Sequence, residues 1–486
     1  MIFYPAFFPG LLSERNHASG FIHSLAKEIG ERSKSCGKLF GIYTDNDAFM
    51  YASVLAAWKA GCGFVPLNNK FPEERLRHII SETGIRCVIG NNNSKEAIEK
   101  LGIDVIIFND DKKWMAADQQ NNDLPVEIKN DPSAFAYVLF TSGSTGIPKG
   151  IPVTFGNLEA FAEDLRTRFD LTASDKVINT YELSFDLSIG SALLAWMSGA
   201  MLYICPMDGI IPLDAVRMIM DHQVNIVSMA PSAVNILKKY RILGEADLSF
   251  IDTTIFGAEA LPYQYVLDWK MAAKNSSMVN AYGPTETTIW ATYYTVDNDT
   301  AHELVNGLVP IGKPARNVDC HIHQQDSIST NANQGELWIS GTQLFEGYLN
   351  NTQKSEEVLT THNGKKFYRT GDLVEMLDSG DLIYLNRLDN QVKINGYRVE
   401  PGEVEYKIRT TLGISACAVI PVTTDHETWL LAVLEKETLT DEERKRLQEA
   451  ITFYMLPRKF ITVQQLPLNH NGKIDRLQLK KEYAGE

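Results

Sequence analysis

The hydrophobic pattern of the chain alternates between buried strands and amphipathic helices. Residues 134–140 form an apolar run that is typical of a buried strand. From Asn157 onward apolar residues recur at helical spacing, which predicts a helix after that strand. Residues 49–58 predict another helix, which ends at glycines and is followed by an apolar segment at 64–67. Helices and strands interleaved in this way predict the α/β fold class.

The pattern changes twice along the chain, and these changes predict its organisation. A polar stretch at 118–132 separates the first helix–strand series from a second one, which runs to about Val309. From Ile311 the chain turns to short β segments between turns, including 335–340 and 381–385. Charged helices follow near the end of the chain. We expect them to form a separate small α+β domain.

Composition excludes several classes of protein. The chain has 486 residues and a formal net charge of −15, which disfavours nonspecific nucleic-acid binding through a cationic surface. The six cysteines show no Cys-x-x-Cys spacing, which predicts reduced thiols and no zinc site. His321 and His323 are closely spaced, but on a strand such a pair is typical of a solvated face. The apolar N-terminus lacks a basic leader, and no run reaches the ~20 apolar residues of a membrane helix. We expect a cytoplasmic protein.

The segment from Thr141 to Gly150 has the composition of a phosphate-binding loop. Its glycines let the backbone approach a ligand, its hydroxyls can donate hydrogen bonds, and Lys149 adds a positive charge. It is not a Walker A loop, because Ile147 and Pro148 precede the lysine and Gly150 follows it. A flexible linker is the alternative, but the predicted strand before the loop argues against it.

Three further islands carry polar groups close to turns. Residues 280–286 combine the aromatic ring of Tyr282 with the carboxylate of Glu286, which could hold Mg²⁺. Residues 368–372 place Asp372 after a tight turn, where it could accept hydrogen bonds from ribose hydroxyls. Residues 471–475 display Lys473 in a turn close to the chain end. Taken singly, each island is typical of an ordinary turn.

Taken in order, these islands resemble the adenylate-forming superfamily. Within it they are most similar to the adenylation domains of nonribosomal peptide synthetases and to freestanding amino-acid:carrier-protein ligases. The resemblance covers nearly the whole chain and includes the segments 58–67, 185–188, 335–349 and 387–405. It implies a large α/β domain over residues 1–386, with packed sheets, helices and a small β-barrel-like part. It also implies a hinge at 387–389 and a mobile C-terminal domain over 390–486.

The resemblance assigns roles in ATP binding and catalysis. The loop would hold the phosphates of ATP, with Thr145 and Glu286 near Mg²⁺. Tyr282 would pack on adenine, while Asp372 and Arg387 would hold the ribose. Lys473 would stabilise the charge that develops at the α-phosphate, and loss of one such donor typically costs about 10²–10³ in rate. The complete implied set comprises Thr141, Ser142, Gly143, Ser144, Thr145, Lys149, Gly257, Ala258, Asn280, Ala281, Tyr282, Gly283, Pro284, Thr285, Glu286, Asp372, Tyr384, Arg387 and Lys473.

The hinge follows from the same resemblance, with Asp389 as its pivot. In this family the small domain swings after adenylation and removes the lysine from the site. Gly396 would then let a phosphopantetheine arm approach. Asn386 and Pro401 depart from the residues of many relatives, and these departures concern the hinge alone.

The substrate class rests mainly on Asp186. A buried carboxylate needs a partner, and the ammonium group of an amino acid supplies one. The alternative is that Asp186 merely caps a turn. The rest of the implied pocket carries no charge, which predicts a substrate with a neutral side chain of undetermined size. This pocket comprises Leu187, Gly190, Ser228, Thr254, Phe256, Ala281, Ile289 and Trp290.

We therefore expect an enzyme that adenylates an amino acid and releases pyrophosphate. The chain shows no Asp-Ser-Leu pantetheine site, so a peptidyl or acyl carrier protein acting in trans is the expected partner. A carrier region removed with the rest of a larger synthetase is equally compatible. The alternatives are a D-alanine:carrier-protein ligase of the cell-wall type, an acyl- or aryl-CoA ligase, and a noncatalytic binding protein with the same fold.

Overall fold

The computed structural model describes residues 2–3, 15–43, 47–92, 94–107, 126–128, 130–142, 147–324, 333–389, 391–424, 427–467 and 474–483. These residues form two compact units, which are considered separately. The large unit contains residues 1–69, 79–139 and 150–388. The small unit contains residues 70–78, 140–149 and 389–486. The boundaries predicted from the sequence, with a hinge at 387–389, remain predictions.

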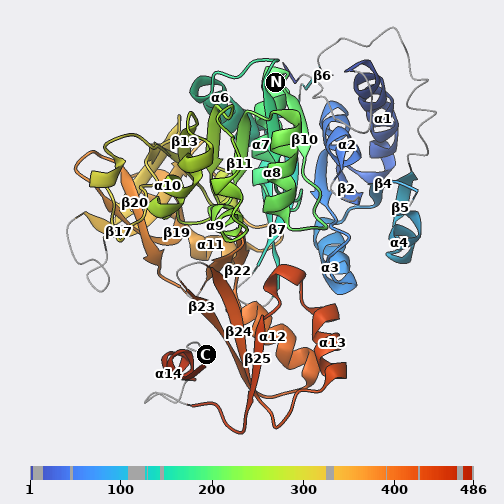
Figure 1. Ribbon diagram of the computed structural model, residues 1–486. Coiled ribbons are helices and arrows are strands. Elements are labelled where there is room, and N and C mark those ends of the chain that lie inside the picture. Colours follow the sequence, from blue (N-terminus) through green and yellow to red (C-terminus); the bar gives the residue numbers. More distant parts are fainter. Residues whose placement is uncertain are drawn as a thin grey trace. The chain divides into compact units, whose positions relative to one another are not determined.

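The first sheet follows the helix–strand alternation of the N-terminal sequence (Figure 1). Its six strands run in the order β5-β4-β2-β3-β7-β8, and the pairings from β5 to β7 are parallel. Because α2 is buried over almost its whole length, it reads as a continuous apolar run, as predicted at 49–58. The elements of this region are α1 (Arg15–Cys36), β2 (Leu39–Tyr43), α2 (Ala48–Lys59), β3 (Gly63–Pro66), α3 (Glu73–Thr83), β4 (Cys87–Gly90), α4 (Lys95–Lys100), β5 (Asp104–Ile107), β7 (Phe135–Thr141) and β8 (Lys149–Thr154), with a short pair β1 (Ile2–Phe3) and β6 (Val126–Glu127).

The second sheet carries most of the candidate site. It has seven strands in the order β10-β9-β11-β12-β13-β14-β15, parallel from β10 to β13 and antiparallel beyond. Thr154 begins α6 with a capping box. The elements are α6 (Phe155–Arg168), β9 (Lys176–Asn179), α7 (Leu187–Ser198), β10 (Met201–Ile204), α8 (Ile211–His222), β11 (Ile226–Met229), α9 (Ser232–Lys239), β12 (Thr253–Phe256), α10 (Tyr263–Ala272), β13 (Ser277–Tyr282), β14 (Thr292–Thr295) and β15 (Lys313–Pro314).

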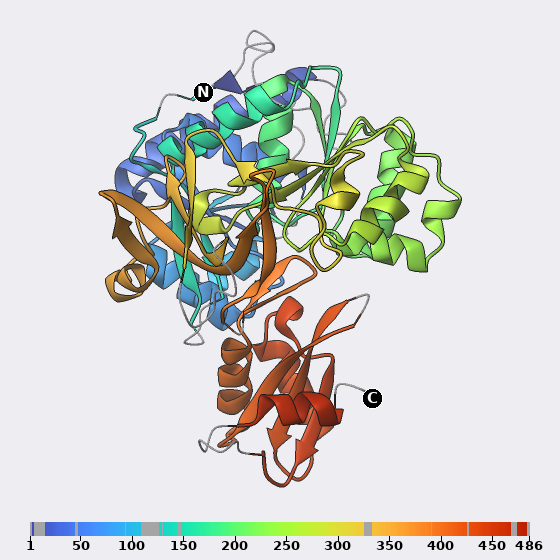
Figure 2. The ribbon, with the colours of Figure 1, turned by 90° about the vertical axis from the view of Figure 1, so that its left-hand side faces the viewer.

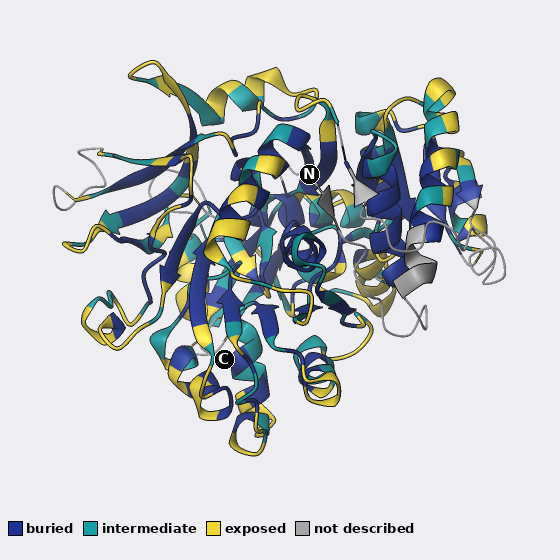
Figure 3. Ribbon diagram, turned by 90° about the horizontal axis from the view of Figure 1, so that it is seen from above, coloured by how far each residue is buried: buried dark blue, intermediate teal, exposed yellow. Residues whose placement is uncertain are grey.

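The two sheets share a core in which helices α2, α6 and α7 meet. The rings of Trp58 and Trp196 lie 5.8 Å apart at a T-shaped angle, and the ring of Phe155 lies 6.2 Å from that of Trp58. Figure 3 shows the strands of the sheets as largely buried, while the outer faces of several helices are exposed. The described residues contain no helix that is both long and apolar enough to cross a membrane. The cytoplasmic location remains a prediction.

The third sheet of the large unit is antiparallel, with β16, β17, β19 and β18 in order and β20 paired to β19. It corresponds to the short β segments predicted after Ile311. Strand β17 contains the whole predicted segment 335–340. Strand β20 contains all but the first residue of the predicted segment 381–385. The elements are β16 (Val318–His323), β17 (Gln334–Gly341), α11 (Thr352–Val358), β18 (Leu359–His362), β19 (Lys365–Met376) and β20 (Leu382–Arg387).

The small unit contains the charged helices expected near the chain end, and Figure 2 shows its C-terminal elements in orange to red. A hairpin turns at Asn395 and Gly396, both of which have positive φ (48° and 85°), as an Asn-Gly turn requires. Pro401 occupies the first turn of α12, where a missing backbone N–H costs little. The elements are β21 (Val392–Ile394), β22 (Tyr397–Val399), α12 (Pro401–Leu412), β23 (Cys417–Thr423), β24 (Thr428–Glu435), α13 (Asp441–Ala450), β25 (Lys459–Val463) and α14 (Arg476–Tyr483).

Candidate active site

Asp186 lies at the start of α7, beyond the carboxyl end of β9, where open α/β sheets place their ligands. Its side chain makes no capping hydrogen bond with the helix. Only 4% of the residue is exposed, and its Oδ2 atom has no hydrogen-bond partner among the described residues. A buried, unpaired carboxylate oxygen is costly unless a ligand satisfies it. The prediction that Asp186 meets an ammonium group rather than caps a turn remains a prediction, since backbone N–H groups of Asp186 and Leu187 also contribute to its pKa.

The surroundings of Asp186 shift its protonation. Burial raises the pKa of the Asp186 carboxyl from 3.8 to about 7, although the Thr285 hydroxyl lowers it. The negative charge of Glu286 contributes to this rise in pKa, and hydrogen bonds from the backbone N–H groups of Leu187 and Asp186 oppose it. A cation beside Asp186 would favour the ionised form again. The role of Asp186 as an ammonium-binding residue remains a prediction.

An apolar wall faces α7 one turn beyond Asp186. A Cβ atom added to Gly190 would lie 3.1 Å from Cγ2 of Ile289 and 3.4 Å from Cη2 of Trp290. Gly190 is therefore the residue that lets these two side chains approach the helix. Leu187, Ala281, Ile289 and Trp290 are all buried and belong to the same apolar cluster.

Ile289 and Trp290 belong to a strained segment that Gln343 holds in place. Thr288 and Ile289 have positive φ values of 59° and 70°, which are unfavourable for β-branched residues. The side-chain amide of Gln343 lies 3.2, 3.3 and 2.8 Å from the carbonyl oxygens of Thr287, Thr288 and Trp290. In return, the Thr288 hydroxyl donates to the backbone carbonyl of Gln343 at 2.7 Å. We call this set of hydrogen bonds the Gln343 clamp.

For three predicted pocket residues the contacts give less direct support for a place in the pocket. Ser228 is buried, and its hydroxyl has no hydrogen-bond partner among the described residues. The Thr254 hydroxyl accepts from the indole of Trp269 at 2.9 Å, and Phe256 packs in the cluster that contains Trp269. The structure thus brings Thr254 and Phe256 to α10 rather than into the cluster of Trp290. Their role in the pocket remains a prediction.

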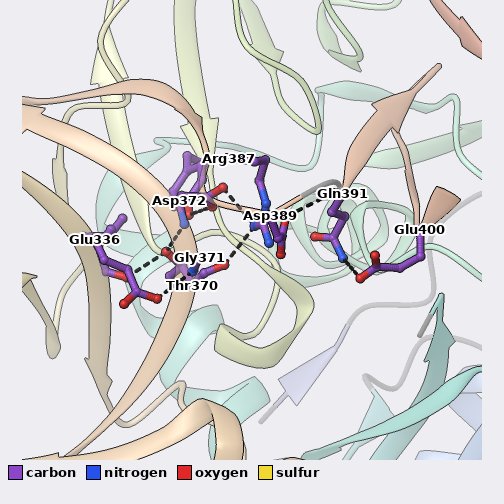
Figure 4. A network of polar contacts seen from close by, with 10 residues as sticks. Glu336, Thr370, Gly371, Asp372, Arg387, Asp389, Gln391 and Glu400 are labelled. Atoms are coloured by element: carbon purple, nitrogen blue, oxygen red, sulfur yellow. Dashed lines mark hydrogen bonds and ion pairs between the residues drawn. The ribbon is translucent and has the colours of Figure 1, made fainter. Parts of the chain in front are cut away.

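The predicted ribose site forms a connected network on β13, β19 and β20 (Figure 4). Arg387 donates to Oδ1 of Asp372 at 2.9 Å and to the carbonyl of Thr370 at 2.8 Å. The Tyr282 hydroxyl donates to Oδ2 of Asp372 at 2.5 Å. Glu336 fixes the turn before Asp372, because its Oε1 accepts from the backbone N–H of Gly371 at 3.1 Å. The network orients Asp372 before any ligand arrives.

Burial and the neighbouring Asp372 raise the pKa of the Tyr282 hydroxyl well above its usual value. Tyr282 therefore keeps its proton and remains a hydrogen-bond donor at physiological pH. Tyr384, the other aromatic residue predicted at this place, is half-buried on β20.

Glu286 is fully buried, and its orientation comes from a neighbouring tyrosine. The hydroxyl of Tyr348 donates to Oε1 of Glu286 at 2.8 Å, and the backbone N–H of Phe345 donates to its carbonyl at 2.9 Å. A carboxylate fixed in this way suits Mg²⁺, which prefers oxygen ligands. The residue types thus fit the predicted metal position.

The other predicted residues of the large unit surround the same strand ends. Asn280 donates to the carbonyl of Pro310 at 2.8 Å, which fixes its amide. Gly283 is needed for close packing, since an added Cβ would lie 2.4 Å from the Ile289 carbonyl oxygen. Ala258 has a positive φ of 74°, a strained conformation typical of functional sites. Gly257, Pro284 and Thr285 complete this set.

The remaining predicted residues lie elsewhere. Thr141, Ser142 and Lys149 belong to the small unit, where the Ser142 hydroxyl donates to the Arg398 carbonyl at 2.8 Å. Asp389 also belongs to the small unit and accepts from the backbone N–H of Gln391 at 3.0 Å. Gly143, Ser144, Thr145 and Lys473 lie outside the described residues.

Comparison with known proteins places this arrangement in a family. A family model described as AMP-binding enzyme matches residues 18–349, which include Asp186, Tyr282, Glu286 and Gln343. The chain belongs to the AMP-binding enzyme family. The predictions that the chain belongs to an adenylate-forming family and that it is a ligase are confirmed.

This AMP-binding enzyme is 32% identical over 473 residues to gramicidin S synthase 1 of Brevibacillus brevis, across 94% of this chain and 41% of the synthase. It is 29% identical over 464 residues to surfactin synthase subunit 1 of Bacillus subtilis (strain 168), across 94% of this chain and 13% of that protein. The chain thus spans less than half the length of these curated relatives.

The fold of the AMP-binding enzyme is similar to that of the Vibrio cholerae adenylation domain AlmE, solved in complex with glycyl-adenosine-5'-phosphate. The TM-score is 0.80 at 23% identity, and the match covers 96% of this chain and 92% of AlmE. At this identity the likeness shows the fold. The predicted α/β class is confirmed.

Proposed function

We propose that this AMP-binding enzyme activates an amino acid with a neutral side chain as its aminoacyl-adenylate, with release of pyrophosphate, and transfers it to the phosphopantetheine thiol of a carrier protein. The observation that carries the proposal is the unpaired, buried Oδ2 atom of Asp186. An α-ammonium group would satisfy this oxygen and stabilise the ionised carboxylate.

In the proposed reaction, Asp186 binds the ammonium group and thereby orients the substrate carboxylate. Asp372 and Arg387 hold the ribose, and Tyr282 packs against the adenine. Mg²⁺, when bound with Glu286 and Thr145 as ligands, would neutralise charge on the phosphates. A substrate carboxylate oxygen then attacks the α-phosphorus, the bond to the β-phosphate oxygen breaks, and pyrophosphate leaves.

The family resemblance adds the residues that lie outside the described part of the chain. Lys473 would reach the substrate carboxylate and the α-phosphate, where a fixed positive charge lowers the barrier to nucleotidyl transfer. Gly143 and Ser144 would hold the departing phosphates together with Thr141, Ser142 and Lys149. Transfer of the aminoacyl group to a carrier protein, with Asp389 as the pivot of a domain rotation, is the second half of the proposal.

Amino-acid-dependent exchange of labelled pyrophosphate into ATP tests the first half directly. A panel of L- and D-amino acids should reveal exchange, and Lys473→Ala should reduce it by about 10²–10³. Absence of exchange with every amino acid would refute the proposal. Activity confined to D-alanine would identify a D-alanine:carrier-protein ligase.

An acyl- or aryl-CoA ligase is the second candidate. The pKa of about 7 for the Asp186 carboxyl favours it, because a protonated Asp186 can accept a substrate without an ammonium group. Consumption of free CoA with a simple carboxylic acid, unaffected by Asp186→Ala, would support this candidate. A severe loss of amino-acid affinity in Asp186→Ala would support the first.

A further inference from the structure

Three histidines lie together on one face of the third sheet. His321 and His323 alternate along β16, and His362 ends β18. The imidazole of His362 stacks on that of His321 at 4.5 Å, and the imidazole of His323 stacks on the indole of Trp338 at 3.9 Å, both measured between ring centroids. The ring of Phe367 lies 6.0 Å from that of His321. We call His321, His323 and His362 the histidine cluster.

The histidine cluster is half-buried rather than fully solvated. The sequence predicts a solvated face at His321 and His323, but both cover aromatic side chains, Trp338 and Phe367, that are only 7% and 5% exposed. The rings of His321 and His362 stack instead of converging on one point, and the described residues contain no group of three His, Cys, Asp or Glu that could hold a metal ion. Proton uptake is the chemistry that this arrangement supports.

The charged groups around the histidine cluster oppose proton uptake. Lys365 pairs with Asp319 at 2.8 Å, and the guanidinium of Arg369 lies 6.0 Å from the Trp338 ring. The carboxylate on β17, Glu336, lies 3.5 Å from Arg369 and accepts from the Trp338 indole. Within the described part of the chain no ion pair joins a histidine of the cluster to a carboxylate. A protonated imidazole would therefore meet other imidazoles and Arg369 without a counter-charge.

The pKa of His321 reflects these surroundings. Burial lowers the pKa of its imidazole below the usual 6.5, and the charges of His362 and His323 lower it further. The neutral cluster therefore stabilises the folded protein above about pH 6.5, and this contribution is lost as the pH falls through the pKa of His321 in the folded protein. Protonation of both His321 and His362 would place like charges in rings 4.5 Å apart, and their repulsion would separate the stack.

Trp338 connects the histidine cluster to the predicted ribose site. Its indole N–H donates to Oε2 of Glu336 at 2.9 Å. Oε1 of the same carboxylate accepts from the backbone N–H of Gly371 at 3.1 Å (Figure 4). Gly371 directly precedes Asp372, which is the proposed ribose ligand. A shift of Trp338 would therefore disturb the carboxylate that fixes the turn before Asp372.

We propose that the histidine cluster is a pH-sensitive element, which loosens Trp338 in mildly acidic solution and, through Glu336 and the turn before Asp372, weakens nucleotide binding. The inference rests on one part of the proposed function, namely the role of Asp372 in holding the ribose. It adds regulation by pH to that site.

Binding of adenosine, measured by calorimetry at about pH 7.5 and about pH 5.5, tests the inference, because adenosine has a ribose but no phosphate that titrates in this range. The Kd of the native protein should rise about 5-fold or more on acidification, as is typical of coupling between two sites. The double variant His321→Phe/His362→Phe keeps both rings and removes both titratable groups, so its Kd should change less than about 2-fold. His222→Phe is the matched control and should keep the native pH dependence, because His222 stacks on Tyr203 at 4.7 Å, outside the cluster.

A single variant covers the case in which the double variant does not fold. His362→Phe removes the charge that faces His321 and should reduce the rise in Kd. The same pH dependence in the native protein and in both cluster variants would overturn the inference and leave the proposed function standing. No adenosine binding at either pH would overturn the inference together with the ribose role of Asp372. Pyrophosphate exchange with no amino acid, alongside the expected adenosine result, would refute amino-acid activation alone.

Discussion

Replacing Gln343 by methionine removes the clamp while keeping a side chain of similar length. The two N–H groups of the Gln343 side-chain amide donate to three carbonyl oxygens at 2.8–3.3 Å. Each lost hydrogen bond costs about 1 kcal/mol net, and a buried carbonyl left without a donor costs about 1–3 kcal/mol. We therefore expect Gln343→Met to lower the free energy of unfolding by about 2–4 kcal/mol. Urea denaturation followed by tryptophan fluorescence measures this loss.

The same substitution should change substrate binding, because the strained conformations of Thr288 and Ile289 would lose their restraint. We expect KM for the amino acid to rise about 10-fold or more, with KM for ATP changing less. Gln264→Met is the matched control, since Gln264 is exposed on α10 and donates to Asp268 one turn away. If Gln343→Met and Gln264→Met have the same unfolding midpoint and the same KM, the clamp has no role in shaping the pocket.

Three other substitutions test the remaining parts of the site. The pKa of Asp186 in the folded protein, about 7, lies above its usual 3.8, so ionisation of Asp186 destabilises the folded protein as the pH rises between these values. Asp186→Asn should therefore be more stable than the native protein at about pH 8, by up to about 4 kcal/mol, and equal to it below about pH 4. Urea titrations at the two pH values measure this difference. Tyr348→Phe removes a hydrogen bond to the buried Glu286 carboxylate, which is worth about 1.5–3 kcal/mol. This substitution should raise the Mg²⁺ concentration needed for half-maximal pyrophosphate exchange about 10-fold. An unchanged Mg²⁺ requirement would contradict a metal role for Glu286. Asp372→Asn removes the ion pair between Asp372 and Arg387 and should raise KM for ATP about 10-fold with little effect on KM for the amino acid, whereas equal increases in both would point to a general loss of structure.

The elements that the sequence predicted well are those whose pattern is local. The buried helix at 49–58 appears as α2, and the helix after the 134–140 strand begins two residues earlier than expected, at Phe155, because Thr154 supplies the cap. Asp186 was predicted by resemblance from a short motif, and Asp372 both from its place after a tight turn and by resemblance. The structure supplies what such a motif cannot contain, namely an oxygen without a partner at Asp186 and two donors at Asp372.

The Gln343 clamp could not be predicted from local sequence, because its acceptors lie 53–56 residues away along the chain. The motif at 335–349 supported the family resemblance but assigned no role to Gln343 or Tyr348. Thr288 and Ile289 also contradict their local preferences, since β-branched residues avoid positive φ. In both cases the tertiary structure overrides the local signal.

The raised pKa of Asp186 has a consequence for proton release and for discrimination between substrates. Near neutral pH this carboxyl is partly protonated, so binding of the proposed ammonium group would expel a proton into the solvent. The measured heat of binding then depends on the buffer that takes up this proton. As the pH falls, the carboxyl becomes neutral and loses its preference for a cation over an uncharged group. If the enzyme activates amino acids as proposed, its selectivity for them over simple carboxylic acids should be greatest in mildly alkaline solution and weaken towards acid.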